Sequence, residues 1–338
     1  MSEVTTSTRG CAVGESIKTM LIDKVGASGA YRIAKLLVRG LPRVLVYHRF
    51  GAHGCDANVF DAQMEILKDE FNVIPLSSLY RALSKGKEIE PHTVVITIDD
   101  GYADFREVAF PILKKYDLPA TLYVVSDFVD QKTWLWPDVI AYTVDNTRHP
   151  EFSVLLNGES RQFNLINAAG RRQAWNEIGD HCLTLRNKVK LAFLEDLART
   201  LDVKVPEQPI ATYASVTWQD LREMQGAGID IGSHTCSHPK LTMVDPDELE
   251  HEVNDSKRRI EEMLQRDVEG FCYPNGSRAD LDHGVKEMVQ RSGYRHATVG
   301  YHDSNVTADM YELGRFASGY DLYTFKKVVY GVDFLRGL

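Results

Sequence analysis

The sequence predicts an α/β fold built on a parallel sheet. From residue 43 onward, short apolar segments alternate with segments of helical periodicity, and this order implies parallel pairing through right-handed crossovers. Thr93–Ile98 is an unbroken run of β-branched residues, which is typical of a strand buried on both faces. Polar residues follow several of these strands directly, and parallel α/β folds bind ligands at that end of the sheet.

Six strands are predicted from apolar or β-branched runs. The first ends at His48, the second at Asp99, and the fifth is stopped by Pro274, because proline cannot donate a hydrogen bond to a sheet. The predicted strands are residues 43–48, 93–98, 120–125, 229–233, 270–274 and 296–299, and the last of these is predicted to be the final strand.

Helices are predicted between these strands. Phe60, Met64 and Leu67 share one face of the first, a spacing that indicates an amphipathic helix. Gly226 ends the third helix, and Pro246 lies in the first turn of the fourth, where proline is tolerated. The predicted helices are residues 58–69, 103–115, 217–226, 246–266 and 281–292.

The regular alternation breaks between residues 131 and 214. This segment is more polar and helix-rich, and it carries Trp134, Trp136 and Trp175. Long insertions between the units of such folds are often lids or binding elements. We therefore expect a helical cap insertion at 131–214, which separates two parts of the α/β fold, residues 41–130 and 215–338.

Composition and charge exclude some classes of function. The formal net charge of −9 gives no attraction to a phosphate backbone, so we expect no nucleic-acid partner. Five scattered cysteines form no disulfide framework, which favours a reducing compartment. We find no secretory signal and no apolar run long enough to span a membrane, so the expected location is the cytoplasm.

The N-terminal region, residues 1–40, contains the start of a basic segment that runs from 15 to 43. Its apolar residues recur at roughly helical spacing, and six basic residues against two acidic ones give it a local charge of +4. A basic amphipathic helix can lie on an anionic membrane surface, which predicts peripheral membrane association. The alternative is a helix docked on the fold with its basic face in solvent.

Two polar clusters at strand ends carry the chemistry. His234 and His238 are four residues apart, and on a helical turn their imidazoles would project to one side and share a cation. Asp99 and Asp100 repel each other at a buried strand end unless a cation or a proton compensates, although they could instead cap the following helix. A cation held by one aspartate and two histidines has an open side, lowers the pKa of bound water and polarises a carbonyl oxygen.

At these motifs the chain resembles the polysaccharide deacetylases of the NodB-homology group, carbohydrate esterase family four. The resemblance runs from about residue 44 to residue 316, interrupted by the segment 131–214. The family motif T-F-D-D-G stands here as Thr97-Ile98-Asp99-Asp100-Gly101, H-[ST]-x-x-H as His234-Thr235-Cys236-Ser237-His238, and F-R-x-P-Y-G as Phe271-Cys272-Tyr273-Pro274-Asn275-Gly276.

The resemblance implies a distorted (β/α)7 barrel that hydrolyses the N-acetyl group of an amino sugar in a polysaccharide, oligosaccharide or lipid-linked precursor. It implies one divalent cation, usually zinc and in some members nickel or cobalt, held by Asp100, His234 and His238. Asp99 is then the general base, and the backbone N–H of Asn275 helps to hold the oxyanion.

The chain departs from the family pattern in two places. Cys272 stands where many members carry an arginine that tethers the catalytic base, and we expect Arg315 to do that work. The late L-x-H motif, whose histidine is the general acid, is absent after residue 300. His48 at the end of the first strand resembles the acid of poly-N-acetylglucosamine deacetylases, in which this histidine comes early in the chain.

Substrate contacts are predicted at Tyr273 in the third motif and at Trp136, whose ring could stack on a sugar or pack in the core of the insertion. Two other functions stay open. One is hydrolysis of a different linear or cyclic amide at the same centre. The other is carbohydrate binding without catalysis, against which the complete set of aspartates and histidines argues. The sugar and the oligomeric state are not determined by the sequence.

Overall fold

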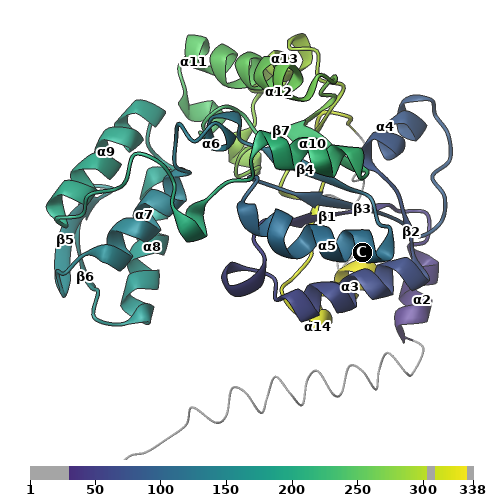
Figure 1. Cartoon of the computed structure of the whole chain (residues 1–338), viewed down its shortest axis with the longest axis horizontal. Helices are drawn as coiled ribbons and strands as arrows, with labels where there is room; N and C mark the ends of the chain where they lie inside the picture. Colours follow the sequence, from purple (N-terminus) through teal and green to yellow (C-terminus); the bar gives the residue numbers. More distant parts are fainter. Residues whose placement is uncertain (1–29, 303–308, 333–338) are drawn as a thin grey trace, which may run out of the picture.

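The computed structural model describes residues 30–302 and 309–332. Its main sheet follows the order β10-β1-β3-β4-β7-β8-β9, with β2 paired to β3 off this path, and its strand pairings are parallel. Helices surround this curved sheet (Figure 1), so the predicted distorted (β/α) barrel is confirmed. The strands are β1 (Arg43–Tyr47), β2 (Asn72–Val73), β3 (Thr93–Ile98), β4 (Ala120–Val124), β7 (Ile229–Ser233), β8 (Gly270–Cys272), β9 (His296–Thr298) and β10 (Phe316–Ala317).

The central strands are buried on both faces, and their sequences are largely apolar. Every residue of β1, β3 and β4 is buried. β1 pairs with β3 over five residues, with Leu45 opposite Ile96, and β4 pairs with β7 over five residues. This register makes the strands end at one edge of the sheet, so that the side chains that follow them meet there.

The chain after β9 closes the barrel. The N–H of Leu313 donates to the carbonyl of Ala297 at 2.9 Å, and the N–H of Val299 donates to the carbonyl of Leu313 at 3.0 Å. A few residues later, Phe316 pairs with Leu45 of β1. The prediction that residues 296–299 form the final strand is therefore wrong, because the two-residue strand β10 is too short to leave a periodic signal.

The barrel helices broadly match the predicted segments. α3 (Ala57–Glu70) begins after Asp56, whose carboxylate accepts hydrogen bonds from two backbone N–H groups of the first turn. Two helices predicted as continuous contain π-helical turns, at Phe105–Ala109 before α5 (Phe110–Tyr116) and at His251–Asp255 between α11 (Pro246–Glu250) and α12 (Ser256–Leu264). The others are α2 (Ala30–Leu37), α4 (Leu76–Ser84), α6 (Ser126–Val129), α10 (Trp218–Gly226), α13 (His283–Arg291) and α14 (Leu322–Val329), of which α4, α6 and α14 were not predicted.

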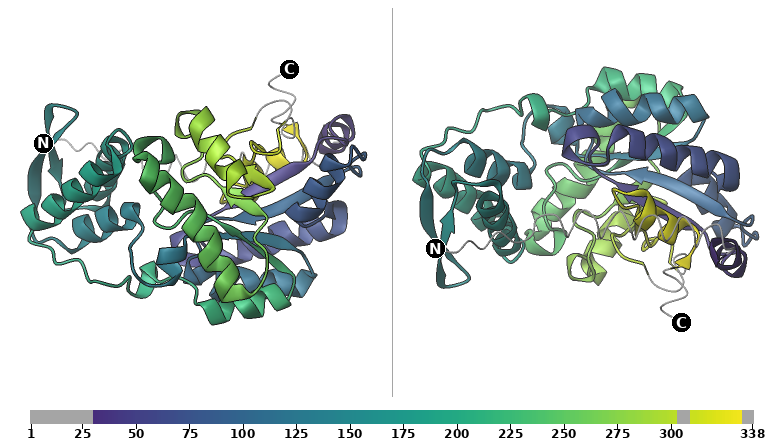
Figure 2. Two further views of the ribbon diagram at one scale, coloured as in Figure 1. Left: turned by 90° about the horizontal axis from the view of Figure 1, so that it is seen from above. Right: turned by 90° about the horizontal axis from the view of Figure 1, so that it is seen from below.

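The inserted segment is a lobe of mixed structure beside the barrel. Three helices, α7 (Trp136–Asn146), α8 (Ala168–Cys182) and α9 (Asn187–Thr200), pack with an antiparallel hairpin of β5 (Glu151–Leu156) and β6 (Glu159–Asn164). The prediction of a helix-rich cap missed this hairpin. Most residues of the two strands are exposed, and β6 is mostly polar. The lobe has its own hydrophobic core. Figures 1 and 2 show it on the side where β4 ends and α6 begins.

α2 is the described part of the predicted basic segment, and residues 15–29 lie outside the described residues. Tyr31 and Ala34 of α2 are buried against the fold, while Ile33, Leu36 and Leu37 are 62%, 58% and 66% exposed. The helix is therefore docked on the barrel and also presents apolar side chains to its surroundings. Among the residues that the structure describes, we find no helix with the length and apolar character needed to cross a membrane.

Candidate metal centre and active site

Polar side chains from four strand ends meet at one edge of the barrel, and Arg315 reaches them from the start of a fifth strand. Asp99 and Asp100 follow β3, His234 follows β7, and Cys272 ends β8. His48 follows β1, and Arg315 directly precedes β10. Residues that are far apart in sequence are brought together here because parallel strands end at a common edge.

Asp100, His234 and His238 converge. The Nε2 atoms of His234 and His238 lie 3.6 and 3.5 Å from the same carboxylate oxygen of Asp100. These separations are too long for hydrogen bonds, but two ligands of one tetrahedral zinc ion also lie about 3.4 Å apart. All three side chains are buried, with exposed fractions of 8%, 2% and 8%.

The donor atoms of this triad are in the state that a cation needs. The Nδ1 of His234 donates to the carbonyl of Cys272 at 2.7 Å, so its Nε2 carries a lone pair that faces Asp100. Burial lowers the pKa of His238 well below its usual value and keeps that ring neutral. Burial raises the pKa of Asp100 to about 6, which marks a carboxylate that lacks a compensating charge. The residues present therefore fit a divalent cation.

The two histidines lie in a loop, so the prediction of a helical turn is wrong. Thr235 and His238 both have a left-handed backbone, with φ of 72° and 62°, and the chain cannot continue as a helix through them. Glu252 fixes this loop, because its carboxylate accepts hydrogen bonds from the N–H groups of Cys236 and Ser237, each at 2.9 Å. Sequence reasoning missed Glu252, which no motif distinguishes from the other acidic residues of its helical segment.

Arg315 forms a bidentate ion pair with the carboxylate of Asp99. Its two terminal nitrogens donate to Oδ1 and Oδ2, each at 2.7 Å, and Nη2 also lies 3.1 Å from the sulfur of Cys272. Burial alone would raise the pKa of Asp99, but the charge and hydrogen bonds of Arg315 hold that pKa well below its usual range. Asp99 is therefore ionised beside the triad, and the sulfur of Cys272 lies next to the ion pair, 3.5 Å from Oδ2 of Asp99.

His48 lies on the open side of Asp99. Its Nε2 is 3.7 Å from Oδ2 of Asp99, and 48% of its side chain is exposed. The walls of the site desolvate the ring and lower its pKa, and the charge of Asp99 opposes that shift only in part. The ring is thus held at the rim of the site, within reach of a group that lies over the triad.

Of the three predicted substrate contacts, Asn275 is exposed, whereas the side chains of Tyr273 and Trp136 are buried. Asn275 is exposed, with a φ of 60°, and its N–H has no hydrogen-bond acceptor within the parts of the chain that the structure describes. The side chain of Tyr273 is 1% exposed and lies in the barrel core, so only its backbone could face a substrate. Trp136 is 6% exposed in the core of the inserted lobe, and its stacking on a sugar stays a prediction.

Comparison with known proteins places this site in a family. The family model for polysaccharide deacetylase matches residues 86–162 and 194–297, more than half of the chain. The polysaccharide deacetylase homologue YxkH of Bacillus subtilis (strain 168) is 21% identical over 257 residues, which are 75% of this chain and 62% of that protein. The chain therefore spans less than two thirds of the length of this curated relative.

Solved structures show the same fold. IcaB from Ammonifex degensii has a TM-score of 0.56 at 15% identity, and the match covers 87% of this chain and 97% of that one. The Streptococcus pyogenes deacetylase PplD in complex with acetate has a TM-score of 0.54 at 19% identity, with 82% and 92% covered. A de-N-acetylase from Aggregatibacter actinomycetemcomitans has a TM-score of 0.53 at 18% identity, with 85% and 99% covered. At these identities the likeness establishes the fold alone.

The buried pair of Asp99 and Arg315 predicts a stability change that depends on pH. Arg315→Met leaves the Asp99 carboxylate buried without its partner, which costs about 3–5 kcal/mol of unfolding free energy at pH 7. The deficit should shrink as the pH falls towards 3, for two reasons: the variant carboxylate becomes protonated, and the wild type loses the stability that came from its lowered pKa. Urea unfolding with a chelator present, at pH 7 and at pH 3–4, measures both values.

The double variant Asp99→Asn with Arg315→Met is the matched control, because it removes both charges and should recover most of the loss at pH 7. An Arg315→Met deficit that is the same at both pH values would contradict the predicted coupling.

Proposed function

This chain belongs to the polysaccharide deacetylase family, and from that premise we propose that it hydrolyses the N-acetyl group of an amino sugar in a metal-dependent reaction that releases acetate. The observation that carries the proposal is the buried triad of Asp100, His234 and His238 with the ionised carboxylate of Asp99 beside it. The substrate is a polysaccharide, an oligosaccharide or a lipid-linked precursor.

Asp100, His234 and His238 would hold the divalent cation, which supplies Lewis acidity toward the acetyl carbonyl and toward water. One carboxylate and two imidazoles are a donor set that suits zinc, and nickel or cobalt can occupy the same ligands. We propose zinc.

The remaining steps belong to side chains around the triad. Asp99 takes a proton from the attacking water, and Arg315 holds its carboxylate in one orientation and keeps it ionised. The N–H of Asn275 donates to the oxyanion as negative charge develops on the acetyl carbonyl oxygen. His48, at the exposed rim, gives a proton to the departing sugar nitrogen from its protonated form, which the charge of Asp99 favours.

An acetate-release screen tests this function. The metal-free chain should release no acetate from N-acetylated sugar oligomers, nucleotide-linked sugars or lipid-linked sugars, and zinc, nickel or cobalt should restore activity on at least one of these classes. A panel of small linear and cyclic amides run in parallel distinguishes deacetylation from other amide hydrolysis. Binding of metal and glycan without hydrolysis of any substrate would show a carbohydrate-binding protein instead.

His48→Gln tests the general acid. It removes the titratable nitrogen but keeps a polar side chain at the rim, so kcat on the substrate found in the screen should fall by about 10²- to 10⁴-fold. Metal content, measured by elemental analysis, should stay at the wild-type level because His48 is outside the triad. A variant with near-normal kcat and normal metal content would remove His48 from proton transfer.

Peripheral membrane contact through residues 15–43 is also part of the proposal, supported by the exposed Ile33, Leu36 and Leu37 on α2. The full chain should float with vesicles that contain anionic lipid and stay unbound with neutral vesicles. Replacing Ile33, Leu36 and Leu37 together with serine should reduce the bound fraction, whereas serine at the exposed Leu155 of the inserted lobe should not. Equal flotation with both kinds of vesicle, or with none, would contradict it.

A further inference from the structure

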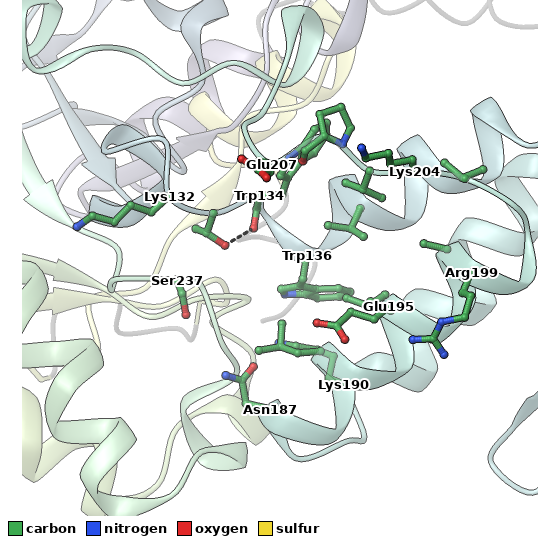
Figure 3. Close-up of a pocket in the computed structure, with 18 of the residues that line it drawn as sticks. Lys132, Trp134, Trp136, Asn187, Lys190, Glu195, Arg199, Lys204, Glu207 and Ser237 are labelled. Carbon is green, nitrogen blue, oxygen red and sulfur yellow. Dashed lines mark hydrogen bonds between the residues drawn. The ribbon is translucent and has the colours of Figure 1, made fainter.

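A groove of about 900 Å³ runs between the inserted lobe and the barrel. One wall comes from α7 and α9 of the lobe, and Ser237 of the loop that carries the histidines lines it from the barrel side. In Figure 3 the ring of Trp136 lies beside Lys190, and Ser237 faces them from across the space. Ser237 immediately precedes His238, so the groove adjoins the metal centre.

Lys190 on α9 is the unusual residue of this groove. Its side chain is 3% exposed, and its ammonium lies 5.1 Å from the centre of the Trp136 ring. Within residues 30–302 and 309–332, this ammonium forms no hydrogen bond and no ion pair. Burial lowers the pKa of Lys190 to about 8, which reflects the cost of holding a charge there without a counterion.

Glu248 and Glu252, two carboxylates whose charges act on Lys190, accept hydrogen bonds from other groups. Glu248 accepts a hydrogen bond from the side chain of Asn187 at 2.5 Å. Glu252 accepts from two backbone N–H groups of the histidine loop and from the hydroxyl of Ser237. Glu195 also lines the groove but is exposed and forms no ion pair with Lys190 within the described part of the chain. Among the residues that the structure describes, the positive charge therefore has no direct anionic partner.

A long side chain that carries a charge would be expected to reach water, as the neighbouring Lys188 does with 73% of its side chain exposed. Lys190 instead lies in the wall of a groove whose lining includes Ser237, the residue next to His238.

We propose that this groove binds an anionic substituent of the acetylated glycan, a phosphate or a carboxylate, with the Lys190 ammonium as its ligand. This inference rests on the proposed function and adds the class of substrate: an N-acetyl glycan that carries negative charge near the scissile acetamide. The anion supplies the counterion that none of the described residues provides. The face of Trp136 covers the ammonium and excludes water from it.

Binding and hydrolysis are measured with three probes: a neutral N-acetylglucosamine tetramer, the same tetramer with one phosphate monoester, and the same tetramer with one carboxylate. Calorimetry on the full chain with a chelator present gives each Kd without turnover, and acetate release is measured separately after zinc is added. The wild type should bind at least one anionic probe about 10- to 100-fold more tightly than the neutral one. The preferred probe distinguishes phosphate from carboxylate.

Lys190→Met keeps the length of the side chain and removes the charge, so the preference for the anionic probe should disappear. Its melting temperature should not fall, because an uncompensated buried charge has been removed. Lys188→Met is the matched control on the same helix. It removes an exposed lysine that pairs with Asp245 at 2.8 Å, and the preference should persist.

Equal Kd values of the wild type for neutral and anionic probes would overturn the inference, as would an anionic preference that survives in Lys190→Met. A large fall in melting temperature for Lys190→Met would show a structural role and overturn it too. Charge-selective binding that depends on Lys190, without acetate release from any probe after zinc is added, would instead contradict the proposed function and leave the groove as an anion-binding site.

Discussion

The bidentate ion pair between Arg315 and Asp99 is the contact on which the site depends. The two hydrogen bonds of this pair join the chain after β9 to the end of β3. The Nε of Arg315 also donates to the carbonyl of Val299 at 3.0 Å. The guanidinium therefore ties together the strands on either side of the barrel's closure. A buried arginine is held here because the carboxylate, a hydroxyl and a carbonyl satisfy its donors.

This ion pair gives the adjacent carboxylates of Asp99 and Asp100 different pKa values. Asp99 is held ionised by Arg315, whereas burial raises the pKa of Asp100, which faces two histidines instead. Asp100 has a left-handed backbone, with φ of 76°, and this reversal lets neighbouring side chains point to different partners. One carboxylate is thus available for proton transfer and the other for a cation, although both come from the same turn.

The inserted lobe adds a second layer to the site. Arg186, Asn187 and Lys188 at the start of α9 contact Asp245 and Glu248 of the barrel. These contacts hold α9 near the histidine loop, which Glu252 fixes from the π-helical turn. The metal centre and the groove therefore share one structural support, and a change in the lobe could alter substrate choice without touching a metal ligand.

The sequence by itself determined the parallel α/β fold and the identity of the polar residues at the strand ends. Strands such as Thr93–Ile98 are buried on both faces and carry an unmistakable apolar pattern, and the motifs after them are local in the chain. Only the tertiary structure decided that β10 closes the barrel, that the histidines lie in a loop, and that Glu252 and Lys190 adjoin the site. The physical reason is that these features depend on contacts between distant segments, and a two-residue strand, a left-handed turn or a single buried lysine leaves no periodic signal in the sequence.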